Sequence, residues 1–340
     1  MIELLVATAV LLLVMGIVMS ALRQSMQQQQ TIWNRTEMHS GVRGATELMQ
    51  QEVGQAGRVA APQAITLQAA TPNPPPTNCD PAHPDTSASG LLPVTSTLGL
   101  WATGGAAPAS YAVITTLDGD NNEETPLWQV VTNPDGVTGS ISACFSKFHA
   151  AGTRLQVLGT FGNGIIPPAP GVLNPPVPGF AGVTNGSTAS VLKMFGDING
   201  DGNMVYVEYT CDTNAGKLYR TSVPFTSGTK PLLTNSLVLL NNIKANPGVP
   251  PTPCFTYQVT SPIIVQGQPL SFVLDVAITL TVETQQIDPI TKQKQTETKA
   301  LLNVSPRNVF NAWELAGAGY TDRIQSTPAT VSALLGMIPS

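Results

Sequence analysis

One loop carries the residues whose types and spacing come nearest to a known ligand pattern. Asp197, Asn199, Asp201, Gly202 and Glu208 fit the calcium-loop pattern D-x-[DN]-x-[DN]-G-x5-E at every fixed position. Oxygen atoms at alternate positions suit a hard cation, and glycine permits the sharp turn that brings them together. The sequence therefore predicts a Ca²⁺ site in this loop.

Two features of the loop limit this prediction. The residues after it, 204–209, read as a strand, and an extended chain would carry Glu208 about 16 Å from Asn203, too far to reach the same ion. The preferred ligands are thus the side chains of Asp197, Asn199 and Asp201 and the carbonyl of Asn203, with Glu208 the weakest candidate. A hairpin turn without metal is the alternative, because Asn-Gly and Asp-Gly pairs form such turns unaided. Both interpretations stay open.

The four cysteines have another use. Cys79, Cys144, Cys211 and Cys254 are an even number, widely spaced and without a CxxC pair, which favours two disulfides in an oxidising compartment over a zinc site. Three connectivities are conceivable. Proximity in sequence favours Cys79 with Cys144 and Cys211 with Cys254.

Catalytic patterns are missing from the sequence. The histidines are His39, His83 and His149, and no GxSxG, HExxH, P-loop or Rossmann glycine pattern occurs. We therefore expect no enzyme, since an active site would have to assemble from carboxylates far apart in the chain. The acidic cluster 118–124 lacks a loop pattern and is expected to be a solvated turn. A net charge of −5 also argues against nucleic acid as a partner.

The elements that position these residues begin with an N-terminal helix. From Leu4 to Leu22 there are 19 residues without a charge, enough for a helix of roughly 28 Å, close to the thickness of a bilayer core. Glu3 stands immediately before them. An apolar stripe with steps of three and four residues follows, so one helix is predicted over 2–57, with a membrane-spanning half and an amphipathic half. The stripe consists of Met38, Val42, Ala45, Met49, Val53 and Ala56.

The rest of the chain is predicted to be rich in strands. Proline-rich stretches separate β-prone blocks at 112–116, 128–131 and 154–160, and two hairpins are expected, 207–220 and 271–304. The fold class is thus α+β, a long helix packed on a mainly antiparallel β-rich domain. The expected divisions are the helix 1–57, a Pro-rich linker or loop 58–95, a β-rich head 96–315 and a C-terminal tail 316–340. Few charged residues, 11%, fit an exported protein.

The N-terminus resembles a known family. Residues 2–7, Ile-Glu-Leu-Leu-Val-Ala, are similar to the core of the type IV pilin and pseudopilin N-terminal methylation motif, and the apolar run after them fits it as well. Residues 45–58 and the hairpin 207–220 resemble the branch of PilW-like minor pilins and J-type pseudopilins of type II secretion. Met1 departs from the pattern, because it stands where the residue before Ile-Glu belongs. The resemblance leads us to expect a leader upstream that a prepilin peptidase cleaves after a glycine.

The resemblance also implies a function. Glu3 is expected to pair with the α-amine of a neighbouring subunit, because an unpaired carboxylate in an apolar core is costly. We expect a minor pilin or pseudopilin that initiates or caps a fibre through helix packing with other subunits. The protein would wait in the inner membrane with its head in the periplasm and later reach the pilus or cell surface. The alternatives are a J-type secretion pseudopilin, a tip adhesin or binding module, and a generic membrane-anchored exported domain.

Overall fold

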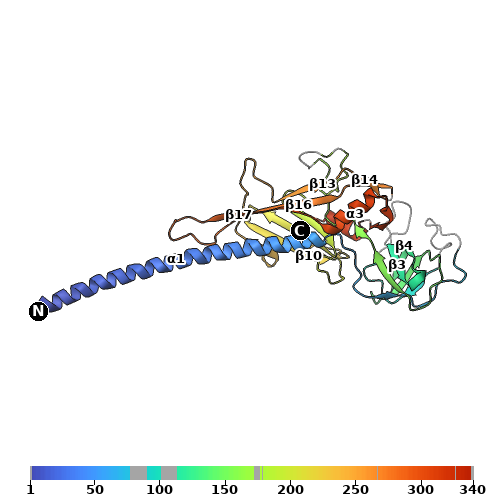
Figure 1. The fold of residues 1–340 in the computed structure, drawn as a ribbon, viewed down its shortest axis with the longest axis horizontal. Helices are drawn as coiled ribbons and strands as arrows, with labels where there is room; N and C mark the ends of the chain where they lie inside the picture. Colours follow the sequence, from blue (N-terminus) through green and yellow to red (C-terminus); the bar gives the residue numbers. More distant parts are fainter. Residues whose placement is uncertain are drawn as a thin grey trace.

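The structure is a computed structural model that describes residues 2–76, 90–100, 113–171, 177, 179–265, 267–325 and 327–337. It has one long N-terminal helix, α1 (Ile2–Gln55), followed by a β-rich and mostly antiparallel head (Figure 1). The N-terminus lies at the far end of the helix, well away from the head. The predicted α+β fold class is confirmed.

Helix α1 extends over 54 residues and ends two residues before the predicted boundary. No proline interrupts it. Just beyond its end Gly57 takes a φ of +83°, a left-handed conformation that suits glycine and terminates helices. A Cβ atom at Gly57 would lie 2.9 Å from the carbonyl oxygen of Phe161, so the chain leaves the helix through a space too narrow for a side chain.

Two sheets flank the second half of α1. The first has the strand order β11-β10-β9-β8, and in the second β16 pairs with β17 along one edge and with β12 and β13 along the other. The predicted hairpins are confirmed as the antiparallel pairs β9–β10 and β16–β17. The strands are β8 (Val191–Gly196), β9 (Val205–Asp212), β10 (Lys217–Pro224), β11 (Val238–Asn241), β12 (Ile243–Lys244), β13 (Phe255–Val259), β16 (Val273–Glu283) and β17 (Thr296–Val304).

A third sheet forms an outer lobe at the end of the molecule farthest from the N-terminus (Figure 1). Its strand order is β1-β6-β3-β4-β5-β2, and β3, β4 and β6 confirm the three predicted β-prone blocks. β1 and β2 come from the Pro-rich segment 58–95, which thus contributes to this sheet. The strands are β1 (Ile65–Thr66), β2 (Leu92–Val94), β3 (Val113–Leu117), β4 (Glu124–Thr132), β5 (Gly139–Ala143) and β6 (Arg154–Leu158).

Short elements complete the described part of the head. They are β7 (Thr160–Phe161), which pairs in parallel with β18 (Ile324–Gln325), the hairpin β14 (Ile263–Val265) and β15 (Gln268–Leu270), the helices α3 (Arg307–Gly317) and α4 (Ala329–Gly336), and the 3-10 turns η1 (Gly119–Asn121), η2 (Asn235–Leu237) and η3 (Thr321–Arg323). α4 packs Val331 and Leu334 into the apolar core of the outer lobe. A second apolar core surrounds the end of α1.

Candidate assembly and membrane-anchoring surface

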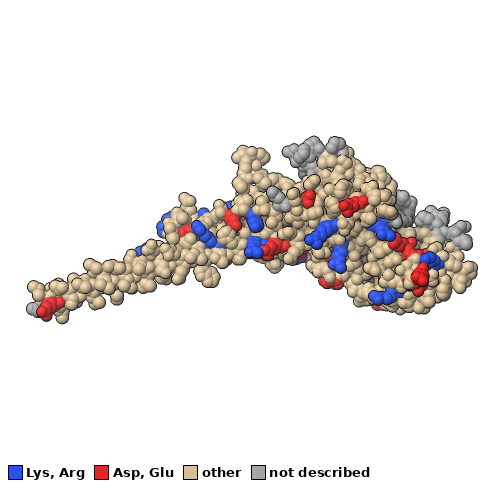
Figure 2. Space-filling model, in the orientation of Figure 1, with Lys and Arg blue, Asp and Glu red and all other residues tan. Residues whose placement is uncertain are grey.

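The head leaves nearly all of the first half of α1 uncovered. Every residue from 2 to 26, which we call the rod, is exposed, although most of its side chains are apolar. Its most apolar 18-residue window has a mean hydropathy of 2.6 and no buried part. On the face seen in Figure 2 the rod is almost free of charge behind an acidic spot near the N-terminus. By length and composition, the rod can cross a membrane.

Glu3 lies in the first turn of α1. A carboxylate there complements the partial positive charge of the helix N-terminus. It is exposed at the N-terminal end of the rod, and no hydrogen bond or ion pair of its side chain occurs within the described residues. Its pairing with the α-amine of a neighbouring subunit stays a prediction, because that partner would belong to another chain.

The second half of α1 is packed as the apolar stripe predicts. Val42, Ala45, Met49 and Val53 are buried, and they contact the cores of both flanking sheets. Met38, at the start of the stripe, is partly buried. The two halves of the helix therefore have different surroundings. The second half packs on the head, and the first half is exposed.

A buried polar cluster joins α1 to the head. The Tyr209 hydroxyl on β9 donates a 2.5 Å hydrogen bond to the Glu52 carboxylate, and the Arg220 Nε on β10 lies 3.0 Å from it. Burial and then the negative charge of Glu52 raise the pKa of the Tyr209 phenol. For Arg220 burial alone would lower the pKa, but the hydrogen bond that its guanidinium donates to Glu52 and the negative charge of Glu52 outweigh burial and raise the pKa. Both donors therefore remain protonated, and they fix the helix on the β9–β10 hairpin.

The loop from Asp197 to Asn203 is a compact turn. The Asp197 carboxylate is fully buried, accepts a 3.2 Å hydrogen bond from the Gly202 amide and lies 3.4 Å from the Arg58 Nε. The Asp201 carboxylate accepts a 2.9 Å bond from the Asn203 amide. Gly202 has a φ of +85°, which this turn requires. The carboxylates thus bind groups of the loop itself and of the chain just after α1.

Glu208 lies apart from these residues. On β9 its carboxylate accepts a 2.6 Å hydrogen bond from the Tyr206 hydroxyl and forms a buried ion pair with Lys230 at 2.9 Å. Within the described ranges no three His, Cys, Asp or Glu side chains are grouped so that they could hold a metal ion. Asn199 and Asp201 are exposed at the loop surface. Ca²⁺ binding through Asp197, Asn199, Asp201 and Asn203 stays a prediction, while Glu208 is bound to Lys230.

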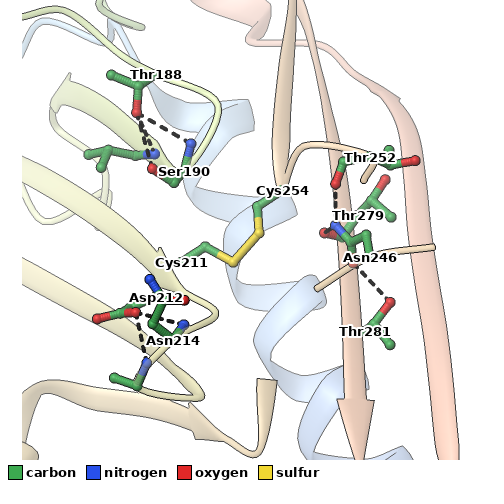
Figure 3. Close-up of a disulfide and its surroundings, with 12 residues drawn as sticks. Thr188, Ser190, Cys211, Asp212, Asn214, Asn246, Thr252, Cys254, Thr279 and Thr281 are labelled. Carbon is green, nitrogen blue, oxygen red and sulfur yellow. Dashed lines mark hydrogen bonds between the residues drawn. A yellow bond between two sulfur atoms is a disulfide. The ribbon is translucent and has the colours of Figure 1, made fainter. Parts of the chain in front are cut away.

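A disulfide joins the two sheets that flank α1. Cys211 on β9 is bonded to Cys254, the residue before β13, with their Cα atoms 6.5 Å apart. Figure 3 shows this bridge in front of α1, between β9 on one side and β16 on the other. The second predicted pair is confirmed. Cys79 lies outside the described residues, so the pairing of Cys79 with Cys144 stays a prediction.

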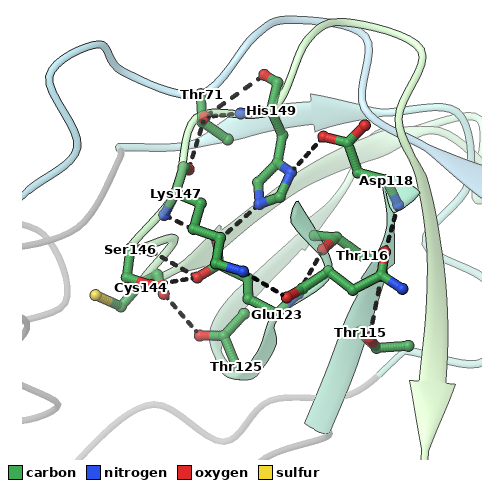
Figure 4. Close-up of polar contacts among 11 residues, drawn as sticks. Thr71, Thr115, Thr116, Asp118, Glu123, Thr125, Cys144, Ser146, Lys147 and His149 are labelled. Carbon is green, nitrogen blue, oxygen red and sulfur yellow. Dashed lines mark hydrogen bonds and ion pairs between the residues drawn. The ribbon is translucent and has the colours of Figure 1, made fainter. Parts of the chain in front are cut away.

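The outer lobe contains a polar cluster that the sequence did not reveal (Figure 4). The ring of His149 is buried, with Nδ1 2.9 Å from the Asp118 carboxylate and Nε2 2.8 Å from the Glu123 carboxylate. The other Glu123 oxygen accepts hydrogen bonds from the amide and hydroxyl of Ser146. The segment 118–124 is therefore more than the solvated acidic turn that was expected. No local signal marks the cluster, because His149 lies 31 and 26 residues from its partners.

The ring of His149 bridges two acidic side chains. Its two nitrogens lie within hydrogen-bond distance of the Asp118 and Glu123 carboxylates, which come from segments on either side of η1. The Thr71 hydroxyl accepts a 2.7 Å hydrogen bond from the His149 amide and so ties the segment before β2 to the same cluster. The cluster fastens three loops of the outer lobe together.

No protein-family model, curated protein or solved structure matches this chain. The architecture itself, a long apolar N-terminal helix followed by a β-rich domain, is compatible with that of a pilin.

Proposed function

We propose that this protein is a minor pilin or pseudopilin whose rod first lies in a membrane and then packs into the core of a fibre. The observation that supports this is the division of α1. The head covers the second half and leaves the rod, residues 2–26, exposed, with an uncharged and mainly apolar run from Leu4 to Leu22. A helix of this kind is not stable in water, because its apolar surface needs lipid or other apolar helices around it.

The same rod suits both environments. Lipid tails are about as apolar as leucine, so a helix can exchange lipid for neighbouring helices at little cost in transfer free energy. Glu3 is the exception, because a carboxylate among apolar helices needs a partner. The α-amine of an adjacent subunit is the partner that the resemblance to pilins suggests, and it would set the register between subunits.

The head would then be exposed and act by packing. It is large for a subunit that repeats along a fibre, and a bulky head fits best at a tip, where few copies are needed. The proposed partners are other pilin or pseudopilin subunits, together with a prepilin peptidase for the precursor. Initiation or capping of a fibre is the proposed role.

Photo-crosslinking in the native cells tests this proposal. A photoreactive residue at Leu11 should crosslink to pilin-type subunits when fibres assemble, and the same residue at Ile264, exposed on the head, is the matched control. Glu3→Gln should reduce the Leu11 crosslinks while the protein stays in the membrane. Crosslinks from Leu11 to lipid alone, unchanged by Glu3→Gln, would leave only a membrane-anchored exported domain.

Deletion separates the remaining alternatives. Loss of fibres supports the initiator, and intact fibres with lost attachment would point to an adhesin. Loss of exported enzymes with fibres intact would instead point to the J-type role in secretion.

A further inference from the structure

The β16–β17 hairpin extends along α1 toward the rod. Its loop passes the helix at Gln30, whose side-chain amide donates a 3.0 Å hydrogen bond to Gln286, and at Thr31, whose hydroxyl donates a 3.0 Å bond to Asp288. Farther back the Arg35 guanidinium binds Gln295. Figure 1 shows the tip of this hairpin as the part of the head that reaches closest to the rod. We call residues 284–295 the hairpin tip.

The hairpin tip is well ordered around a buried carboxylate. Asp288 is buried, its carboxylate accepts a 2.7 Å hydrogen bond from the Ile290 amide, and its backbone carbonyl accepts a 2.8 Å bond from the Lys292 amide. The two isoleucines on either side face outward, with Ile287 58% and Ile290 56% exposed. Hydrogen bonds to Asp288 therefore fix the conformation of a loop that exposes two large apolar side chains to solvent.

The surface beside these isoleucines continues onto the rod. A mainly apolar groove of about 1020 Å³ lies between the hairpin tip and α1, with Pro289 on one wall and Leu22, Met26 and Trp33 on the other. Trp33 is 76% exposed. Apolar side chains of the rod and Pro289 of the head thus line one groove, together with polar side chains such as Gln27 and Gln30.

The level of the hairpin tip along α1 decides what can cover it. Leu22 is the last residue of the uncharged run, and Met26, which shares the groove with Pro289, follows about 6 Å farther along the helix. The polar layer of a bilayer extends about 5–8 Å beyond its hydrocarbon core on each side. A helix tilt of about 20° would bring one side of the head nearer still. The contacts of the tip with Gln30 and Thr31 lie about 12–14 Å beyond Leu22. With the rod in a bilayer, the end of the hairpin tip nearest Met26 therefore lies at the headgroup layer, and the rest of the tip lies just outside it.

We propose that the hairpin tip is a membrane-contact site that inserts Ile287 and Ile290 into the boundary between headgroups and acyl chains. This rests on the first stage of the proposed function, the rod in a bilayer. Arg23 follows the uncharged run directly and Lys292 lies on the hairpin tip; both are exposed, and cationic side chains near a membrane surface are attracted to anionic lipids. The contact holds the head in one orientation beside the membrane before assembly.

Tryptophan quenching by brominated lipids tests the contact with the full chain, one copy per nanodisc. In a Trp33→Phe background, Ile290→Trp places a reporter on the hairpin tip, and Ile264→Trp, 62% exposed in the parent, is the matched control on β14. The fluorescence of the background variant is subtracted. We expect the fractional quenching at Ile290→Trp to exceed that of the control by about two-fold or more. Ile287→Trp serves as a second reporter.

The outcomes are distinct. Stronger quenching at Ile290→Trp and Ile287→Trp than at the control supports the contact. Equal quenching at all three positions, or none at the hairpin tip while the protein stays in the disc, would overturn it and leave the proposed function intact. Failure of the chain to enter discs would overturn both. A blue-shifted but unquenched emission would show protein packed on the hairpin tip in place of lipid, and would also reject the proposal.

Discussion

The two halves of α1 share one backbone and differ in everything around it. Residues 2–26 are exposed and apolar, whereas the second half buries its stripe from Val42 to Val53 and even a carboxylate, Glu52. In the exposed half apolar side chains occur on all sides, and in the buried half polar and apolar side chains are sorted by face. The apolar surface that the head leaves exposed on residues 2–26 is unfavourable in water, so lipid or other apolar helices are needed to cover it. The stability of the head therefore depends on the buried half, and the proposed membrane anchoring and assembly would depend on the exposed half.

The largest expected effect tests the buried half. Glu52→Ala leaves Tyr209 and Arg220 without their shared acceptor, and we expect a loss of about 3–5 kcal/mol in the free energy of unfolding of the head. Denaturant unfolding monitored by circular dichroism measures it. A double variant, Glu52→Leu with Arg220→Leu, should recover part of this loss, since no charge is then left unpaired. A double variant as unstable as Glu52→Ala would contradict this explanation.

A charge introduced in the exposed half should weaken membrane insertion and leave the free energy of unfolding of the head unchanged. Leu12→Arg places a guanidinium near the middle of the uncharged run, and we expect membrane insertion to become less favourable by about 3.5 kcal/mol. The unfolding of the head should not change, because this residue is exposed and has no contact with it. Flotation with liposomes measures insertion, with Leu12→Ile as the control. A shifted unfolding midpoint would show that the two halves are coupled.

Two side-chain truncations, one in each half of α1, compare the halves directly. Met49 is fully buried, and Met49→Ala should cost about 3 kcal/mol of unfolding free energy through lost contacts and a cavity. Leu11→Ala, an exposed leucine in the other half, should leave the unfolding of the head unchanged. Both are measured by denaturant unfolding. Equal effects would mean that the halves are not distinct.

The smallest expected effect concerns pH at the base of the hairpin tip. Burial alone would raise the pKa of Glu283, but hydrogen bonds from Lys294 and Lys244 outweigh it and lower the pKa below its ordinary value of 4.5. The stabilisation is therefore complete above that value and is lost as the pH falls through the lower folded value. Because both lysines are exposed, it amounts to less than about 1 kcal/mol. The protection of residues 284–295 against hydrogen exchange, measured relative to the intrinsic exchange rate at each pH, should fall in acid, and Glu283→Gln should remove this change.

The parts of the fold that sequence could predict are those governed by local periodicity. The stripe from Met38 to Ala56 has the spacing of a helix face, and its burial follows from that spacing alone. The hairpins β9–β10 and β16–β17 were predicted because their strands are neighbours in the chain.

Contacts between distant residues could not be predicted in this way. Glu52 reads as an ordinary helical glutamate, because its partner Arg220 lies 168 residues away. The same is true of His149, whose carboxylates come from another loop. In the loop after β8, the pattern that includes Asp197 and Asn199 is compatible with a turn and with a cation site. Asp and Asn oxygens can accept hydrogen bonds from the backbone of a turn, and the same oxygens can bind Ca²⁺.

The disulfide between Cys211 and Cys254 has a mechanical consequence. A pull on the rod enters the head along the buried half of α1, parallel to β16 and β17, so the side-chain contacts along the stripe are strained together and not one after another. The two sheets that flank the helix could separate under this tension, but the covalent bridge crosses between them. Forced unfolding is governed by the unfolding rate constant. We expect the disulfide to lower this rate, because it keeps both sheets around the helix. Reduction of this bond should make the protein extensible at lower force.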